Sequence, residues 1–168
     1  DTLTKIVPEL YAATRQGVVA ISSEGGEAEA FPYALHGVFT RCLVADAKGV
    51  LLAAGTGDRG VRYSKDGGRT WLEARDLAVG DVRALAFQGA ALWAGTAPFG
   101  LHRSDDGGAV FRGIPLDGPY AEGFAAPPAE DDPRVTAILA APAGLLVGIH
   151  SGGVLLSTDG ATLRDVSG

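Results

Sequence analysis

Aspartates that recur in one local pattern are the strongest candidates in this sequence for acid–base catalysis. Asp66, Asp106 and Asp159 each follow a serine by two positions and directly precede a glycine. Two carboxylates on either side of a glycosidic bond can cleave it. An aspartate beside glycine can instead accept hydrogen bonds from the backbone N–H groups of a tight turn. Because all three stand in the same turn-like setting, we predict that they form turns and are not catalytic acids.

The histidines and the single cysteine give no sign of a metal or nucleophile site. His36, His102 and His150 stand far apart and lack the His-x-x-x-His spacing of metal ligands. Cys42 lies in an apolar run, which predicts a buried, unreactive thiol, and one cysteine cannot form an internal disulfide. The sequence has no phosphate-binding glycine loop, serine elbow or cysteine pair. We therefore predict neither a metal nor a cofactor.

Composition narrows the class of protein. The chain has 168 residues, 46% of them apolar, with 25 glycines and a net charge of −6. An acidic chain argues against a nucleic-acid partner, because phosphate binding depends on basic residues. No apolar stretch reaches the roughly 18 residues of a membrane span. The chain begins at Asp1 and not at Met, so an export signal could have been removed; the compartment stays open, with a secreted or periplasmic location slightly favoured.

The turn-like pattern repeats four times. Copies begin at Ser22, Ser64, Ser104 and Ser157, spaced about 40 residues apart with one longer gap before the last. The first copy carries Glu24 in place of aspartate. Each copy is preceded by a Gly-x-x-x-Ser or similar run and, further upstream, by a small-residue run such as Ala-Gly-Thr. Four matches in register indicate a true internal repeat.

Each repeat is predicted to hold four short antiparallel strands separated by glycine, aspartate and proline turns. In the first repeat these strands are residues 2–7, 10–13, 17–22 and 27–31, and the last strands of the other repeats are residues 70–74, 110–114 and 162–166. Four-stranded units repeated about every 40 residues are typical of β-propeller blades. The sequence thus predicts an all-β chain, one propeller domain of four four-stranded blades at residues 1–37, 38–79, 80–133 and 134–168. It could be a whole small propeller or part of a larger one.

The pattern Ser-x-Asp-x-Gly-x-Thr-Trp resembles the Asp box, also called the bacterial neuraminidase repeat (BNR). Residues 64–71 match in full, and the other three copies match in part. The resemblance implies a structural role in the turn before each last strand, with the aromatic residue packed on the blade. The residues given this role are Ser64, Asp66, Gly68, Trp71, Ser104, Asp106, Gly108, Phe111, Ser157 and Asp159. The chain looks most like bacterial BNR-repeat proteins and photosystem II stability and assembly factors.

The resemblance leaves two function classes open. One is a non-catalytic scaffold that binds a protein or glycan partner through loops on one face, and this is the function we favour. The alternative is a sialidase-like glycoside hydrolase or a fragment of one. The resemblance would then imply an arginine cluster, a Tyr–Glu pair and an acid, for which only Tyr120 and Glu122 lie near each other. Residues 111–115, Phe-Arg-Gly-Ile-Pro, approach the family's Phe-Arg-Ile-Pro motif with one glycine inserted.

In a propeller, the turns between second and third strands share one face with the loops between blades. Ligands of propellers usually lie on this face. The candidate binding residues there are Arg15, Asp58, Arg59, Phe99, Tyr120, Glu122 and His150. These positions could equally be ordinary solvated turns. The long segment 115–134 could be a functional loop or a mobile excursion.

The blade pattern also bears on assembly. Most propellers close their ring by mixing strands from both chain ends in one blade, and here no strand is left over to do so. We therefore expect that the chain does not close alone as a four-blade monomer. A two-fold dimer would give eight blades, and further blades in the same chain would also cover the open ends.

Overall fold

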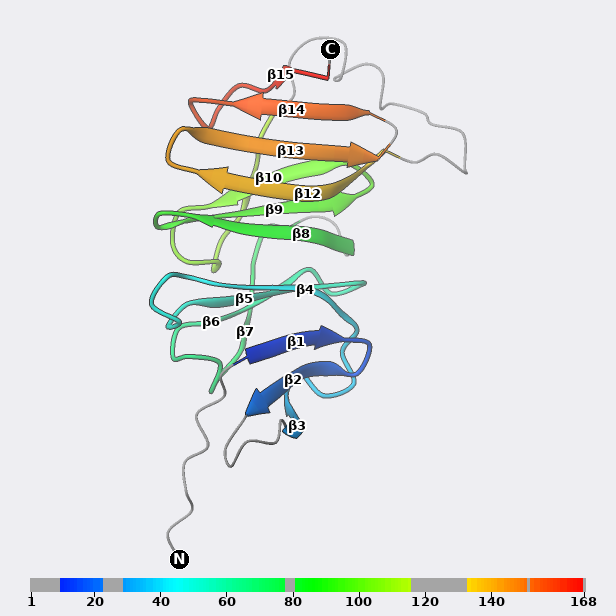
Figure 1. Ribbon diagram of the computed structural model, residues 1–168, viewed down its shortest axis with the longest axis vertical. Helices are drawn as coiled ribbons and strands as arrows, with labels where there is room; N and C mark the ends of the chain where they lie inside the picture. The colour runs from blue at the N-terminus through cyan, green and yellow to red at the C-terminus, as the bar shows by residue number, and fades with distance from the viewer. Residues whose placement is uncertain (1–9, 23–28, 78–80, 116–132, 151, 168) are drawn as a thin grey trace, which may run out of the picture.

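The computed structural model describes residues 10–22, 29–77, 81–115, 133–150 and 152–167. This part of the chain is built of β-strands and turns, without a helix, and holds none that could cross a membrane. The strands form one three-stranded and three four-stranded sheets (Figure 1). In each sheet, consecutive strands pair in antiparallel fashion, so that every sheet is a meander. The predicted all-β propeller fold is confirmed in this architecture.

The sheets follow one another along the sequence. The first sheet contains β1 (Leu10–Thr14), β2 (Gly17–Ser22) and β3 (Glu29–Ala34). The second contains β4 (Thr40–Ala45), β5 (Leu52–Thr56), β6 (Val61–Ser64) and β7 (Leu72–Glu73). The third contains β8 (Asp81–Gln88), β9 (Ala91–Ala97), β10 (Gly100–Ser104) and β11 (Arg112–Gly113). The fourth contains β12 (Arg134–Ala141), β13 (Gly144–His150), β14 (Gly153–Ser157) and β15 (Arg164–Asp165).

The bounds of several strands differ from the sequence prediction, and one predicted strand is not tested. The strand expected at residues 2–7 lies outside the described residues, and the one expected at 27–31 is found as β3, three residues further along at its end. The last strands of the other sheets are only two residues long, shorter than predicted. The reason is that the aspartate of each turn holds residues assigned to these strands: the backbone N–H groups of Thr70, Val110 and Thr162 all donate to turn carboxylates.

The four sheets stack face against face in sequence order. Figure 1 shows the first sheet at one end of the long axis and the fourth sheet at the other. Contacts link β1 with β4, β4 and β5 with β8, and β8 and β9 with β12. The described sheets therefore form an open row of propeller blades, in which the outer faces of the first and fourth sheets are not brought together.

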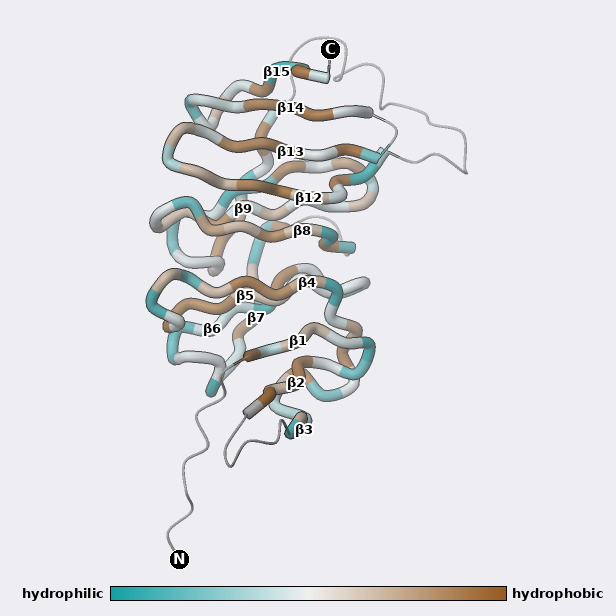
Figure 2. Tube along the Cα trace, viewed as in Figure 1, coloured by the Kyte–Doolittle hydropathy of each residue, from teal (hydrophilic) through white to brown (hydrophobic). Residues whose placement is uncertain are grey.

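Apolar side chains fill the spaces between sheets. Along β8, buried and half-buried residues alternate, as expected for a strand between two packed faces. One core cluster lies between the second and third sheets and includes Val61, Val82 and Leu92. Another lies between the third and fourth sheets around Trp93 and Val135. Figure 2 shows the apolar residues running along the strands, with polar ones gathered at many of the turns.

Two glycines allow neighbouring sheets to approach closely. A Cβ added at Gly55 in β5 would lie 2.7 Å from the Cγ1 of Val82, in the first strand of the next sheet. A Cβ added at Gly95 in β9 would overlap Val135 in the same way, one sheet further on. These glycines hold equivalent register positions, opposite Cys42 and Ala84 respectively. The interface between blades thus repeats one local arrangement, in which a valine seats against a glycine of the preceding sheet.

Candidate functional site

The turn between β6 and β7 shows what the repeated serine and aspartate do. The hydroxyl of Ser64 donates to Oδ1 of Asp66 at 2.8 Å and accepts from the N–H of Gly68 at 2.8 Å. The other end of the turn is held by Thr70, whose N–H and hydroxyl donate to Asp66 at 2.9 and 2.7 Å. The indole of Trp71 donates to the carbonyl of Gly68 at 2.9 Å. The carboxylate of Asp66 is therefore occupied by its own turn.

The third and fourth sheets carry the same turn. Ser104 donates to Asp106 at 2.7 Å and accepts from the N–H of Gly108 at 2.9 Å. Ser157 donates to Asp159 at 3.2 Å and accepts from a backbone N–H at 2.9 Å. Phe111, which follows the third-sheet turn, is buried in the core against the second sheet, whereas Trp71 is half-buried over its own turn. The equivalent segment of the first repeat, residues 23–28, lies outside the described residues.

Hydrogen bonds stabilise the ionised form of the turn aspartates. Bonds from the hydroxyl and N–H of Thr70, and then from Ser64, lower the pKa of Asp66 to about 2. Bonds from Thr162 and Ala161 likewise lower the pKa of Asp159. For Asp106, burial by itself would raise the pKa, but the bonds from Ser104 and from two backbone N–H groups outweigh it. A carboxylic acid catalyst needs the opposite shift, since it must keep its proton near neutral pH.

Acid is therefore expected to destabilise the folded chain between about pH 4 and pH 2. The pKa of Asp66 is about 2 when folded and about 4 when unfolded. A depressed folded pKa stabilises the fold above the unfolded pKa, and this contribution is lost as the pH falls through the folded one. Urea midpoints measured across this range should fall in the native chain. They should fall less in Asp66→Asn, which starts from a lower midpoint at pH 7.

A matched control for the acid experiment is Asp58→Asn, because the Asp58 side chain is 70% exposed and pairs only loosely with Arg59 at 3.9 Å. This variant should show the full acid-dependent fall in the urea midpoint. An Asp66→Asn curve parallel to that of the native chain would contradict the assignment of Asp66 as a stabilising turn anion.

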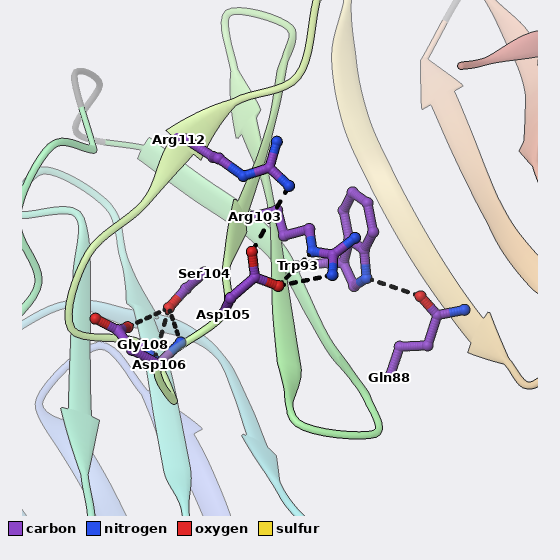
Figure 3. A network of polar contacts seen from close by, with 8 residues as sticks. All are labelled: Gln88, Trp93, Arg103, Ser104, Asp105, Asp106, Gly108 and Arg112. Atoms are coloured by element: carbon purple, nitrogen blue, oxygen red, sulfur yellow. Dashed lines mark hydrogen bonds and ion pairs between the residues drawn. The ribbon is translucent and has the colours of Figure 1, made fainter. Parts of the chain in front are cut away.

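A second polar network lies beside the turn of the third sheet (Figure 3). Arg103 lies between the ring of Trp93, 5.3 Å from its centroid, and Asp105, which it pairs at 2.6 Å. Arg112 approaches the other oxygen of Asp105 at 3.6 Å. The indole of Trp93 donates to Gln88 at 3.1 Å, and Gln88 donates to a carbonyl of the fourth sheet at 2.9 Å.

Two hollows adjoin this network, and Arg103 lines both. One, of about 270 Å³, lies over the turn and is also lined by Asp105 and Arg112. The other, of about 570 Å³, lies between the turns of the third and fourth sheets and is lined by Gln88 and Pro142. Because Asp105 neutralises the guanidinium of Arg103 directly, we interpret the network as a brace between two sheets and not as an anion site.

The opposite ends of the strands form the rim, which we define as the turns that follow β1, β5, β9 and β13 together with the starts of β4, β8 and β12. Of the predicted binding residues, Arg15 lies in the turn after β1, and Asp58 and Arg59 in the turn after β5. Phe99, in the turn after β9, packs against the core between the third and fourth sheets. His150 ends β13. Tyr120 and Glu122 lie outside the described residues.

The rim contains a cluster of charged and aromatic side chains, of which only Arg15 was among the predicted binding residues. Asp81, at the start of β8, pairs through Oδ1 with Arg41 of the neighbouring sheet at 2.5 Å and through Oδ2 with Arg83 at 2.7 Å. The guanidinium of Arg41 also lies 4.4 Å from the ring centroid of Phe39, and that of Arg15 lies 5.8 Å from it. These five residues come from three consecutive sheets.

β-Bulges place these arginines. The pairing of β4 with β5 shifts by one residue at Arg41, and that of β8 with β9 shifts at Arg83. A bulge leaves one residue out of the ladder and redirects its side chain, a device common beside binding sites. Phe39 lies close over the next turn because Gly57 carries no side chain: a Cβ there would be 2.8 Å from the ring. The feature of the sequence that could have revealed this cluster is that Arg41 and Arg83 stand at equivalent positions near the start of two repeats.

Burial favours the neutral forms of Cys42 and His102. Burial raises the pKa of the Cys42 thiol to about 11, which leaves little thiolate at neutral pH. Burial also lowers the pKa of His102, and neither of its ring nitrogens has a hydrogen-bond partner among the described residues. In the same part of the chain, no three acidic, histidine or cysteine side chains are grouped as metal ligands would be.

Comparison with known proteins supports the fold and leaves the family open. No family model and no curated protein sequence matches the chain. Among solved structures, an ancestral GH74 enzyme matches 94% of this chain at 15% identity with a TM-score of 0.70. YCF48 bound to D1 peptide matches 74% at 20% identity with a TM-score of 0.55. The extracellular domain of a hybrid two component system from B. thetaiotaomicron matches 92% at 15% identity with a TM-score of 0.63.

The chain spans only part of these proteins: 22% of the GH74 enzyme, 37% of YCF48 and 22% of the extracellular domain. At such identities the likeness concerns the fold alone. Together with the four stacked antiparallel meanders, it identifies the chain as a set of consecutive β-propeller blades.

Proposed function

We propose that the chain is a non-catalytic β-propeller scaffold that binds an anionic group of a protein or glycan partner at its rim. The observation that carries this proposal is the cluster in which Asp81 holds Arg41 and Arg83, while Arg41 and Arg15 lie against Phe39. One carboxylate orders two of three guanidinium groups, so the cluster keeps an excess of positive charge. This local excess contrasts with the net charge of −6 for the whole chain.

Arginine suits this role because its planar guanidinium can donate two parallel hydrogen bonds to a carboxylate or sulfate. The side chains of Arg41 and Arg83 are 28% and 31% exposed, so they are both supported from behind and open to solvent. Since their positions are fixed before a ligand arrives, less side-chain freedom is lost on binding.

We interpret the Ser-x-Asp-x-Gly turns as Asp boxes of the BNR type. Their hydrogen bonds are satisfied within the turns, and they lie at the ends of the strands opposite the rim. This division leaves the rim free for a partner. Among the structural neighbours, YCF48 is described as bound to a peptide, which favours a protein partner. The arginine cluster favours a partner that presents an acidic segment, and a charged glycan would offer the same chemistry.

The alternative, a sialidase-like glycoside hydrolase or part of one, draws support from the fold it shares with a GH74 enzyme. Hydrolysis needs a carboxylate pair or a Tyr–Glu pair beside the bond. On the described rim, Asp81 is engaged by two arginines, and the Tyr120 and Glu122 candidates lie outside the described residues. We therefore rank the scaffold function first.

The test is binding to an array of sialylated, uronic-acid, sulfated and neutral glycans together with acidic and neutral peptides. We expect retention of anionic probes, weakened about tenfold or more by Arg83→Ala and by Arg15→Ala, since each removes charge-assisted hydrogen bonds. Arg112→Ala is the matched control, because Arg112 is 59% exposed but lies away from the rim. Equal retention of neutral probes, or release of sugar from aryl glycosides or sialosides, would contradict the proposal, and sugar release would favour the hydrolase.

A further inference from the structure

Among the described residues, nothing packs on one face of the fourth sheet. Its inward face, with Val135, Leu145, Val147 and Leu155, is buried against the third sheet. By cross-strand register, the opposite face of strands β12, β13 and β14 consists of two rows of apolar residues: Leu139, Leu146 and Leu156, and Ala137, Gly148 and Val154. The side chains of Leu139, Leu146 and Val154 are 63%, 37% and 38% exposed. We call these six residues the end face.

The end face has a buried equivalent within the same chain. In the third sheet, the corresponding register rows contain Ala84, Gly95 and Leu101, and Ala86, Trp93 and Arg103, with Arg103 at the position of Leu156. There these residues pack on the fourth sheet, where Trp93 is fully buried and Leu101 is 2% exposed. The end face therefore presents the surface that this chain uses elsewhere to hold its next blade.

At Gly148 the end face has the same space, which we call the seat, that a valine of the next sheet fills at Gly55 and Gly95. It pairs with Ala137 as Gly95 pairs with Ala84 and Gly55 with Cys42. In those two sheets a Cβ at the glycine would collide with a valine of the following sheet, whereas at Gly148 the nearest atoms all belong to β12 of its own sheet. Glycine weakens the interior of a strand unless another chain segment approaches closely. The seat at Gly148 thus fits a strand that begins its sheet and supplies a valine, as β8 and β12 do; the corresponding strand of the first sheet lies outside the described residues.

The other end of the row offers a complementary surface. On the first sheet, Val18 and Ala20 are buried, while the alternate residues Leu10, Ala12, Val19 and Ile21 form the opposite face. Leu10 is 63% exposed. In the fourth sheet, the residues of the equivalent register, Leu145, Val147 and Leu155, are those that pack on the preceding sheet. The end face of the fourth sheet thus resembles a surface on which a following blade packs. The outer face of the first sheet resembles a surface that packs on a preceding blade.

We propose that the occupant of the end face is the first sheet of a second copy of this chain. The contact is head-to-tail, and two such contacts related by a two-fold axis close a ring. Two rows of four sheets give eight blades, within the range of known propellers. The six residues of the end face are apolar, and Arg164 of β15 borders them beside Leu156. An apolar centre with a charged residue at its margin is typical of a contact surface that is shielded from water.

Sedimentation of the 168-residue chain over a wide range of concentrations tests this proposal. The expected species is a dimer of twice 17.1 kDa, whose melting temperature rises with concentration. Leu146→Glu should raise the dimer dissociation constant about 100-fold or more, because it places an unpaired charge in the apolar contact. Leu72→Glu is the matched control: Leu72 is 53% exposed on β7, and its variant should remain a dimer.

A second variant distinguishes loss of the dimer contact from misfolding of Leu146→Glu. Gly148→Val fills the seat and should also yield a monomer, while its CD spectrum keeps the native strand signal. A native chain that is monomeric at every concentration would overturn the proposal, as would a series of growing oligomers without a discrete dimer. So would Leu146→Glu and Gly148→Val proteins that both stay dimeric. None of these outcomes depends on ligand binding at the rim.

Discussion

Replacing Trp93 by alanine is expected to lower the free energy of unfolding by about 3–5 kcal/mol, the usual cost of truncating a large buried aromatic side chain. The Trp93 side chain has no exposed surface and belongs to the core between the third and fourth sheets. Its indole is bonded to Gln88, and its ring is covered by Arg103. The variant would lose the apolar contact, leave a cavity and release the brace that ties the two sheets together.

Urea unfolding followed by CD measures this effect without relying on the lost fluorophore. Trp71→Ala is the matched control, since Trp71 is half-buried and donates its indole hydrogen bond to its own turn. We expect the control to lose clearly less stability than Trp93→Ala. An equal or larger loss in Trp71→Ala would show that the core between these sheets does not dominate the stability of the chain.

Replacing Gly95 by valine is expected to cost about 3 kcal/mol, toward the upper end for an overpacked core. A side chain at this position would collide with Val135, whose own exposure is 1%. Because Val135 belongs to β12, relief of the collision requires the fourth sheet to move away from the third. We therefore expect faster hydrogen exchange in β12–β14, together with a lower urea midpoint.

The matched control is Gly113→Val, in the short strand β11. The nearest atom to a Cβ at Gly113 is a ring nitrogen of His102 at 4.0 Å, an ordinary contact distance. This variant should leave exchange in the fourth sheet unchanged. If both variants had the same urea midpoint, close approach at Gly95 would not be a determinant of blade packing.

The sequence allowed the fold to be predicted because its main determinants are local and repeated. The serine and aspartate pattern marks each turn, and strand positions follow from short apolar runs between glycines. The lengths of the last strands were overestimated, since the hydrogen bonds of Thr70 and Thr162 to their turn aspartates became visible only in three dimensions.

The candidate site was harder to predict because it depends on pairing between strands. That Arg41 and Arg83 lie outside the ladder follows from where each bulge falls, which a single sequence does not specify. Their shared partner Asp81 bridges two sheets, so the pair with Arg41 arises from packing between repeats. Conversely, Phe99 was taken as a rim residue from its turn position, and the structure places its ring against the core between sheets.

The brevity of β7, β11 and β15 has a consequence for solubility. Each of these two-residue strands forms one edge of its sheet. A long, flat edge strand is a template on which another polypeptide can add itself through backbone hydrogen bonds, the usual start of fibrillar aggregation. Edges this short offer a foreign strand few backbone groups to pair with. Along the three four-stranded sheets, the outer edges are thus protected by their shape, and a charged residue in each, Glu73, Arg112 or Arg164, adds to this protection.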